Sequence, residues 1–445
     1  MADYAAGPYA YWLAAGIPAD RDDKMIENVI QLFAEENLAG MGQTEEGAEA
    51  GETIEIGTAE ELQTFAKSVS DGSRDGYKGT TVLLTSDIDC TGLEWVPIGT
   101  MNMENMNDMT CMFQGVFDGQ NHTISNITFS SDYPVCGVGV IGMNLGEVKN
   151  LTVKNVNISC TDTNSMAVGG VVGYNMYGSI HDVTLTGDNS IAAVNAIGGI
   201  AGGSTGTVNN CTVDGTTIKV LGDNDFSSGR IIQCDIAECG GLIIGGSFGG
   251  TMDNCKAKGI VTAEGNEPVG MGGIAGCLEM MDSVTNCTAD VEIVSEKGGH
   301  AIGGLCGFSG THSVGDVAAA TEGIVTTKYP GIIDNCSVTV KMNVPGATHV
   351  GGLVGTGLYY YGEETAFKIT NCTVKGEITG AVTPGAVAGR AENSVIESCD
   401  TDITLDGAAL TEQVGSTDTM YESSDQAEEG SEGSTGETAE VEPAA

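Results

Sequence analysis

Apolar and polar residues alternate along most of this chain. From Thr80 to about Leu405, short segments of Val, Ile, Leu and Thr with a period of two residues are separated by Gly, Asn and Asp. A period of two is typical of β-strands with one buried face, and the separating residues are typical of turns. The sequence therefore predicts many short strands.

Two segments before Thr80 have helical spacing instead. In residues 20–40 the apolar residues fall on one helical face, and in residues 58–69 Thr58 is followed three positions later by Glu61, which is the spacing of a capping box. Residues 41–52 are rich in Gly and Glu and are interpreted as a linker. The apolar residues of the first helix are Met25, Ile26, Val29, Ile30, Phe33 and Leu38.

Two sequence elements recur within the predicted strands. The first reads Gly-Gly-aliphatic-small-Gly and begins at Gly169, Gly198, Gly272, Gly303 and Gly351, with looser copies at Gly240 and Gly385. The second has Asn, Asp or Ser followed by Leu, Val or Cys. Its eight copies are Asn150-Leu151, Asp182-Val183, Asn210-Cys211, Asn254-Cys255, Asn286-Cys287, Asn335-Cys336, Asn371-Cys372 and Ser398-Cys399.

Successive copies of the second element lie 27 to 49 residues apart. The shorter spacings suit one coil of three short strands, and the longer ones require insertions. The fold class predicted is all-β: a right-handed parallel β-helix, with a helical N-terminal segment and linker at 1–52, an N-terminal coil at about 53–135 and repeats at about 136–405. Residues 406–445 are predicted to form a disordered acidic tail, because from Thr411 onward they contain ten acidic and no basic residues.

Stacked coils turn each repeat position into a ladder of similar residues. Asn tolerates the left-handed conformation of a bend and can hydrogen-bond to the Asn of the next coil. The following position exchanges Leu, Val and Cys, so we interpret it as inward-facing and its cysteines as small apolar residues. Five copies also match the N-glycosylation sequon, which the repeat explains without glycosylation.

Composition supports this interpretation and excludes some partners. The chain has 67 Gly, 9 Pro and 5% aromatic residues, and a formal net charge of -44. Such a charge repels phosphate backbones, so nucleic acid is not an expected partner. No apolar run is long enough to span a bilayer, and Met1–Ala5 lacks the features of a signal peptide. The sequence is therefore interpreted either as a fragment of a longer protein or as a cytosolic chain, and its composition favours the fragment.

Enzymatic and metal-binding motifs are weak. The Gly-x-Ser-x-Gly motifs at Ser204 and Ser247 lack the strand-to-helix context of a nucleophile elbow. Asp87, Asp89 and Asp118 have the types of neighbours seen in turns, which we favour over calcium binding. A local disulfide between Cys234 and Cys239 and a pair of buried thiols are both left open. We therefore predict no catalytic residues, no metal and no cofactor.

The repeats, of the form Gly-Gly-Leu-Val-Gly and Ile-x-Asn-Cys, resemble the GLUG motif of bacterial surface and adhesin-like proteins, found also in non-catalytic regions of some peptidases that cleave immunoglobulin A. The resemblance covers about residues 53–405, and includes Leu84-Thr-Ser-Asp-Ile-Asp-Cys90 and Phe113-Gln-Gly-Val-Phe-Asp-Gly119 in the N-terminal coil. It implies a β-helix with an extracellular or cell-surface location.

The expected function is a non-catalytic scaffold or adhesin-like module that binds a glycan or a host or bacterial surface protein, or that acts as a spacer. The alternatives are a polysaccharide-active β-helix enzyme and the non-catalytic region of a larger surface peptidase. The candidate contact surface is one lobe formed by insertions at about 308–331 and 356–368, in two consecutive repeats. Its aromatic residues are Tyr329, Tyr359, Tyr360 and Tyr361, which suit stacking on a sugar or protein but could instead pin the loops to the β-helix.

Overall fold

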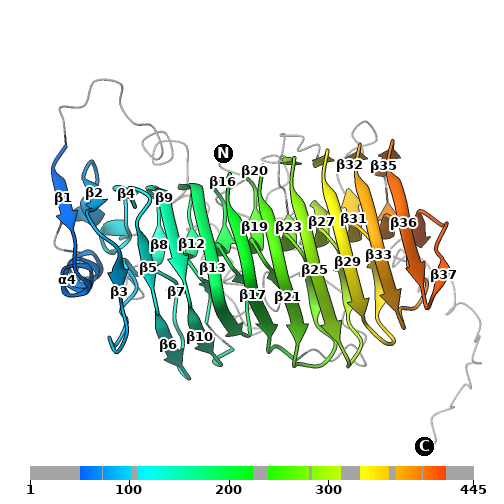
Figure 1. Cartoon of the computed structure of the whole chain (residues 1–445), viewed down its shortest axis with the longest axis horizontal. Helices are drawn as coiled ribbons and strands as arrows, with labels where there is room; N and C mark the ends of the chain where they lie inside the picture. The colour runs from blue at the N-terminus through cyan, green and yellow to red at the C-terminus, as the bar shows by residue number, and fades with distance from the viewer. Residues whose placement is uncertain are drawn as a thin grey trace, which may run out of the picture.

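The chain winds into successive coils whose strands stack in register. The computed structural model describes residues 51–72, 74–102, 108–163, 165–223, 239–279, 283–311, 331–359, 367–392 and 394–416. Within them lie three sheets of 22, 7 and 9 strands. In each sheet, strands of successive coils lie side by side along one axis (Figure 1). This is the parallel β-helix that the repeats predict.

One coil illustrates the path of the chain. Strand β22 (Val269–Gly272) belongs to the seven-stranded sheet, and β23 (Ala275–Glu279) belongs to the nine-stranded sheet. The chain then enters the long sheet as β24 (Ser283–Thr285), bends, and continues in the same sheet as β25 (Thr288–Ser295). The Gly-Gly element therefore connects the two smaller sheets, and the Asn-Cys element forms the bend within the long sheet.

Each of the two smaller sheets contains at most one strand from each coil. The seven-stranded sheet also contains β7 (Gly137–Val138), β11 (Ala167–Gly169), β14 (Ile197–Gly198), β18 (Gly240–Gly241), β26 (His300–Gly303) and β30 (Thr348–Gly351). The nine-stranded sheet also contains β8 (Ile141–Asn144), β12 (Val172–Asn175), β15 (Ala201–Ser204), β19 (Ile244–Phe248), β27 (Cys306–Thr311), β31 (Val354–Tyr359), β34 (Ala388–Glu392) and β38 (Val414–Ser416).

The long sheet carries strands on both sides of the bend. Before the bend lie β2 (Thr81–Leu84), β4 (Val116–Asp118), β16 (Thr207–Asn209), β20 (Thr251–Asp253), β28 (Ile332–Asp334), β32 (Phe367–Thr370) and β35 (Ser394–Glu397). After it lie β3 (Ile88–Asp89), β5 (Thr123–Ser125), β6 (Thr128–Ser131), β10 (Asn157–Cys160), β17 (Thr212–Val220), β21 (Lys256–Ala263), β29 (Ser337–Asn343), β33 (Thr373–Thr379) and β36 (Asp400–Leu405). Strands β9 (Glu147–Lys154) and β13 (Ser179–Ala193) run through it.

Alternation of buried and exposed residues explains why these segments are strands. In β29, Val338, Val340 and Met342 are buried and the residues between them are exposed. Most buried apolar residues join one core that runs the length of the solenoid, and a smaller second cluster includes Met143, Tyr174 and Phe308. Each coil adds its own apolar side chains to this core, so burial grows with the number of repeats.

Glycine of the Gly-Gly element is required by close approach of two backbones. A Cβ atom on Gly307 would lie 2.5 Å from the nitrogen of Met271 and 2.5 Å from the oxygen of Ala301. Strand β27 therefore presses directly against strands of the seven-stranded sheet, and no larger residue fits there.

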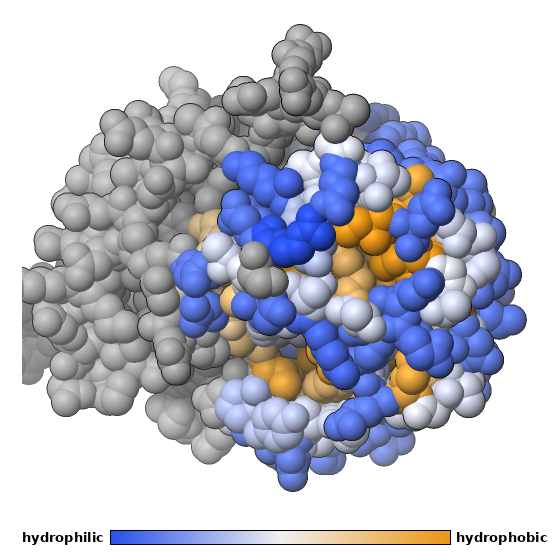
Figure 2. Space-filling model, turned by 90° about the vertical axis from the view of Figure 1, so that its left-hand side faces the viewer, coloured by the Kyte–Doolittle hydropathy of each residue, from blue (hydrophilic) through white to orange (hydrophobic). Residues whose placement is uncertain are grey.

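A helix and edge strands close the N-terminal end. Helix α4 (Ala59–Ser70) begins at the predicted capping box: the Glu61 amide donates to Thr58 Oγ1 at 3.2 Å, and the Thr58 amide donates to Glu61 Oε2 at 3.0 Å. Its residues Leu62, Phe65 and Val69 are buried against the apolar core of the first coils. Strand β1 (Thr53–Ile56) pairs with β2, and short 3-10 helices lie at η1 (Asp75–Tyr77) and η2 (Met109–Cys111). Figure 2 shows this end, where hydrophobic patches lie among mainly hydrophilic residues.

The solenoid continues past Leu405, where the sequence places the start of the tail. Strand β37 (Ala408–Ala409) folds back antiparallel on β36, and β38 adds to the nine-stranded sheet by pairing with β34. The predicted helix at 20–40 and the rest of the predicted tail, 417–445, lie outside the described residues. Within the described residues, no helix is long and apolar enough to cross a membrane.

Candidate functional site

The bend in the long sheet is built by the predicted Asn position. All eight copies adopt the left-handed conformation, with φ between 50° and 56°. Asn, Asp and, less readily, Ser accept this conformation because a short polar side chain bonds to nearby backbone. The left-handed copies are Asn150, Asp182, Asn210, Asn254, Asn286, Asn335, Asn371 and Ser398.

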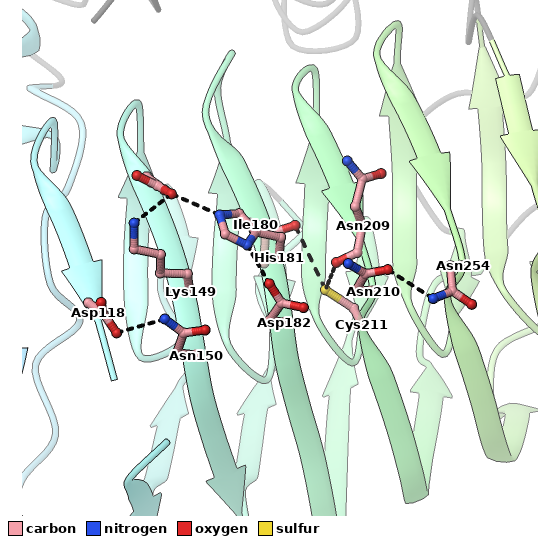
Figure 3. Close-up of polar contacts among 11 residues, drawn as sticks. Asp118, Lys149, Asn150, Ile180, His181, Asp182, Asn209, Asn210, Cys211 and Asn254 are labelled. Carbon is pink, nitrogen blue, oxygen red and sulfur yellow. Dashed lines mark hydrogen bonds and ion pairs between the residues drawn. The ribbon is translucent and has the colours of Figure 1, made fainter. Parts of the chain in front are cut away.

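Side chains at this bend hydrogen-bond from coil to coil (Figure 3). The Asn254 amide donates to Asn210 Oδ1 at 2.9 Å, and the Asn335 amide donates to Asn286 Oδ1 at 2.7 Å. In other coils the acceptor is an aspartate of the preceding coil, so the ladder is mixed and not purely asparagine. These pairs are Asn150 with Asp118 at 3.0 Å, Asn286 with Asp253 at 2.6 Å and Asn371 with Asp334 at 2.8 Å.

The cysteines that follow the bend face inward as thiols. Five of the six are buried and Cys399 is half-buried, and none forms a disulfide. Their sulfurs lie close to backbone carbonyls of the preceding coil, as in the 3.4 Å contact of Cys255 Sγ with the Val208 oxygen. Hydrogen bonding with Cys336, together with burial, raises the pKa of Cys372 to about 12. A thiol with so high a pKa is a poor nucleophile at neutral pH.

A second ladder, which the sequence analysis missed, lies where the nine-stranded sheet turns into the long sheet. Asn144, Asn175, Ser204 and Ser247 stack in register and are fully buried. The Asn144 amide donates to Asn175 Oδ1 at 2.7 Å, and the Asn175 amide donates to Ser204 Oγ at 3.2 Å. Both serines of the Gly-x-Ser-x-Gly motifs therefore serve in this ladder. The available signal was a polar residue two positions after Gly142, Gly173, Gly202 and Gly245.

An ionic network across two coils was also missed. His181 lies between two carboxylates, with Nδ1 2.8 Å from Asp182 and Nε2 2.8 Å from Glu147, whose Oε1 also accepts from Lys149 at 2.9 Å (Figure 3). Burial lowers the pKa of His181, but hydrogen bonds with Asp182 and Glu147 outweigh it and raise the pKa overall. Burial raises the pKa of Glu147, and its bonds to His181 and Lys149 lower it overall. Sequence periodicity gave no sign of this network because its partners are 34 residues apart.

Two of the three predicted turn carboxylates, Asp89 and Asp118, accept hydrogen bonds within turns, whereas Asp87 accepts from the next coil. Asp89 accepts from the Thr91 amide at 2.9 Å, and Asp118 accepts from the Gln120 amide at 2.9 Å. Asp87 accepts from the Thr123 amide at 2.9 Å, which lowers the pKa of its carboxyl group. Within the described part of the chain, no group of three His, Cys, Asp or Glu residues is arranged to hold a metal ion.

The predicted aromatic lobe lies mostly beyond what the structure describes. Tyr359 ends strand β31, whereas Tyr329, Tyr360 and Tyr361 lie outside the described residues. The strand ends that flank the two insertions are neighbours: Thr311 pairs with Tyr359 where the chain leaves, and Ile332 pairs with Lys368 where it returns. Cys239 is buried, and Cys234 lies outside the described residues, so their pairing stays open.

Fold and repeats define a parallel β-helical repeat protein whose coils are linked by polar and thiol ladders. Residues 164–191 and 346–379 match the GLUG motif, and each match spans about one coil. The chain thus contains GLUG-motif repeats, as the resemblance implied. No curated protein sequence matches the chain. Among solved structures, the chain is similar to a crystal structure described as "a putative immunoglobulin A1 protease from Bacteroides ovatus", with 20% sequence identity over 65% of this chain and 77% of that chain and a TM-score of 0.44.

Proposed function

We propose that the chain is a non-catalytic β-helical scaffold, secreted or on a bacterial cell surface, that presents a lobe of two stacked loops to a glycan or protein partner. The observation that carries the proposal is the pairing of the strand ends that flank the two insertions. GLUG motifs, whose resemblance implies surface proteins, support the location.

The register of the strands that flank the two insertions supports a single lobe formed by both. Strands β27 and β31 pair over their whole length, from Cys306 with Val354 to Thr311 with Tyr359. Paired parallel strands end about 4.8 Å apart, so both insertions leave the solenoid from the same edge. Strands β28 and β32 pair in the same way where the insertions return. Two segments anchored this closely, with three tyrosines in the second and one in the first, would offer a shared surface of the kind that stacks on sugars or fills protein hot spots.

The chemistry of the repeats supports a scaffold rather than an enzyme. The serine hydroxyls of both Gly-x-Ser-x-Gly motifs are buried in a structural ladder, and the Ser247 hydroxyl donates to the Gly249 oxygen at 2.9 Å. At the buried thiol of Cys90, burial raises the pKa to about 12. His181 is held on both sides by carboxylates. These hydroxyl, thiol and imidazole groups therefore take part in contacts that stabilise the fold.

A triple substitution tests the lobe. We expect Tyr359→Ala, Tyr360→Ala and Tyr361→Ala together to lower binding in a glycan array or a surface-protein pull-down at least tenfold, because each lost ring removes roughly 1 kcal/mol or more of contact. The matched control is Tyr133→Ala, since Tyr133 is 63% exposed in another coil. Binding that survives the triple substitution removes the lobe as the binding site. Loss of binding together with a lowered melting temperature assigns the rings to loop packing instead.

A further inference from the structure

Charge is distributed unevenly over this acidic chain. The net charge is -44, with only 17 Lys and Arg. Eight strands of the long sheet, β9, β13, β17, β21, β25, β29, β33 and β36, carry seven lysines and nine carboxylates, a net charge of only -2. The part of these strands after the bend, here called the long face, is therefore nearly neutral, whereas the chain as a whole would repel another copy.

The middle column of the long face alternates in charge. In register from coil to coil it contains Lys154, Thr186, Asp214, Lys258, Asp290, Thr339, Lys375 and Asp402. Thr186 is half-buried and the other seven residues are exposed. The residues on either side of each along its strand are less exposed, except for Gly187 beside Thr186 and Gly215 beside Asp214. One ion pair forms within the column, between Lys258 and Asp290 at 3.5 Å. The order of charges in this column is the basis of the inference.

We propose that the long face is a docking surface for a second copy of this chain, packed face to face with its coils in the opposite order. A two-fold axis parallel to the strands brings each column against the same column of the second copy. The middle column then places Lys154 opposite Asp402 at both ends, and Lys258 opposite Asp290 at the centre. No two like charges meet in it.

Other columns of the long face agree with this arrangement. One contains Thr152, Thr184, Thr212, Lys256, Thr288, Ser337, Thr373 and Asp400, and its reversal pairs Thr152 with Asp400 and Lys256 with Thr288. Another begins at Asn157 of the adjoining strand β10 and continues with Ser190, Thr217, Ile260, Glu292, Lys341, Glu377 and Thr404. Its reversal pairs Lys341 with Thr217 and Glu377 with Ser190. Neither reversal opposes like charges.

Dimers in which one copy is displaced by one coil along the solenoid axis bring like charges together, so the charges select one register. A shift by one coil in one direction brings Lys154 against Lys375, Asp214 against Asp290 and Lys258 against its own copy. A shift by one coil in the other direction brings Asp290 and Glu292 each against its own copy. Like charges that face each other across an interface weaken binding. Repulsion in the shifted dimers, together with attraction in the unshifted one, therefore favours a single register.

The size of the long face is adequate for association. Eight strands about 4.8 Å apart, each contributing about six residues at about 3.3 Å, give roughly 750 Å² per copy. The total of roughly 1,500 Å² is that of a standard protein–protein interface. Exposed side chains there are mainly Thr, Lys, Asp and Glu, so we expect a polar and reversible interface.

Charge exchange tests the register. In sedimentation velocity of the full chain, we expect a concentration-dependent dimer whose Kd rises about tenfold with Lys154→Asp and with Asp402→Lys, because each single change creates two repulsive contacts per dimer. The double variant should restore the dimer, since the two new charges again face each other. The matched control is Lys78→Asp, which changes an exposed lysine outside the long face.

Three outcomes would overturn the proposal: a monomer at every soluble concentration, a dimer that the single variants leave unchanged, or single-variant losses that the double variant does not restore. Circular dichroism of each variant excludes misfolding as a cause, because both residues are exposed and their strands are held by backbone pairing.

Discussion

Single residues set the bend of each coil and the contacts that cross it. The Asn position adopts φ near 50° in every copy, and in five copies its side chain donates to the coil before it. The residue after it is inward and accepts Leu, Val or Cys, because only volume and apolarity matter there. The sequence predicts both roles correctly, since each is repeated eight times at a fixed position.

Substitution at one buried thiol tests the inward position. We expect Cys287→Val to lower the free energy of unfolding by less than about 1.5 kcal/mol, because the volumes are similar and no covalent bond is lost. Cys287 is fully buried and contacts the Thr285 oxygen at 3.2 Å, so Cys287→Asp should cost several kcal/mol by burying a charge. Denaturant unfolding measures both variants. Failure of Cys287→Val to fold would contradict the role of this position as a small apolar site.

The network around His181 predicts a pH dependence of stability. Because the folded-state pKa of His181 is raised above the usual value, its protonated form contributes stability that is fully present below the unfolded-state pKa and is lost as pH rises through the folded-state pKa. We expect the melting temperature of the wild type, relative to that of His181→Gln, to fall as the pH rises from about 6.5, the usual pKa of histidine, into the range above it. A difference that is constant over this range would show that the histidine makes no charged contact in the fold.

At the scale of elements, helix α4 and the strands follow their sequence signals closely. The helix begins at the predicted Thr58 cap, and the strands alternate as their period predicts. Less could be predicted where an element depends on contacts between coils. The buried ladder at Asn144 and Asn175 escaped notice because later coils replace Asn by Ser and then by Leu278, and the ionic network depends on strand register.

The cap of α4 gives a prediction for the N-terminal end. We expect Thr58→Ala to lower stability by about 1 kcal/mol, because the Glu61 amide loses its acceptor at the start of the helix. Hydrogen exchange of amides in α4 and β1 should rise more than exchange in β29, which lies many coils away. Equal increases throughout the chain would instead show that the solenoid unfolds as one unit from this end.

At the scale of the whole molecule, the GLUG repeats produce a rod with distinct surfaces. Coils follow one another along a single axis from β1 to β38 (Figure 1). The two insertions that we propose as a binding lobe leave the solenoid at one edge. The long face carries the column of alternating charges that we propose for dimerisation. The repeats predict the rod, but the surfaces could not be predicted, because they depend on which outward residues become neighbours once the register is fixed.

The order of coils along one axis also determines how the molecule would resist mechanical load. Tension applied between residues 51 and 416 would run along the solenoid axis, parallel to the hydrogen bonds between coils and across the strands. Such a force strains the contacts of one terminal coil at a time and leaves the interior coils intact. A tether made this way would lengthen in small steps, each releasing one repeat, and would shorten again when the load falls.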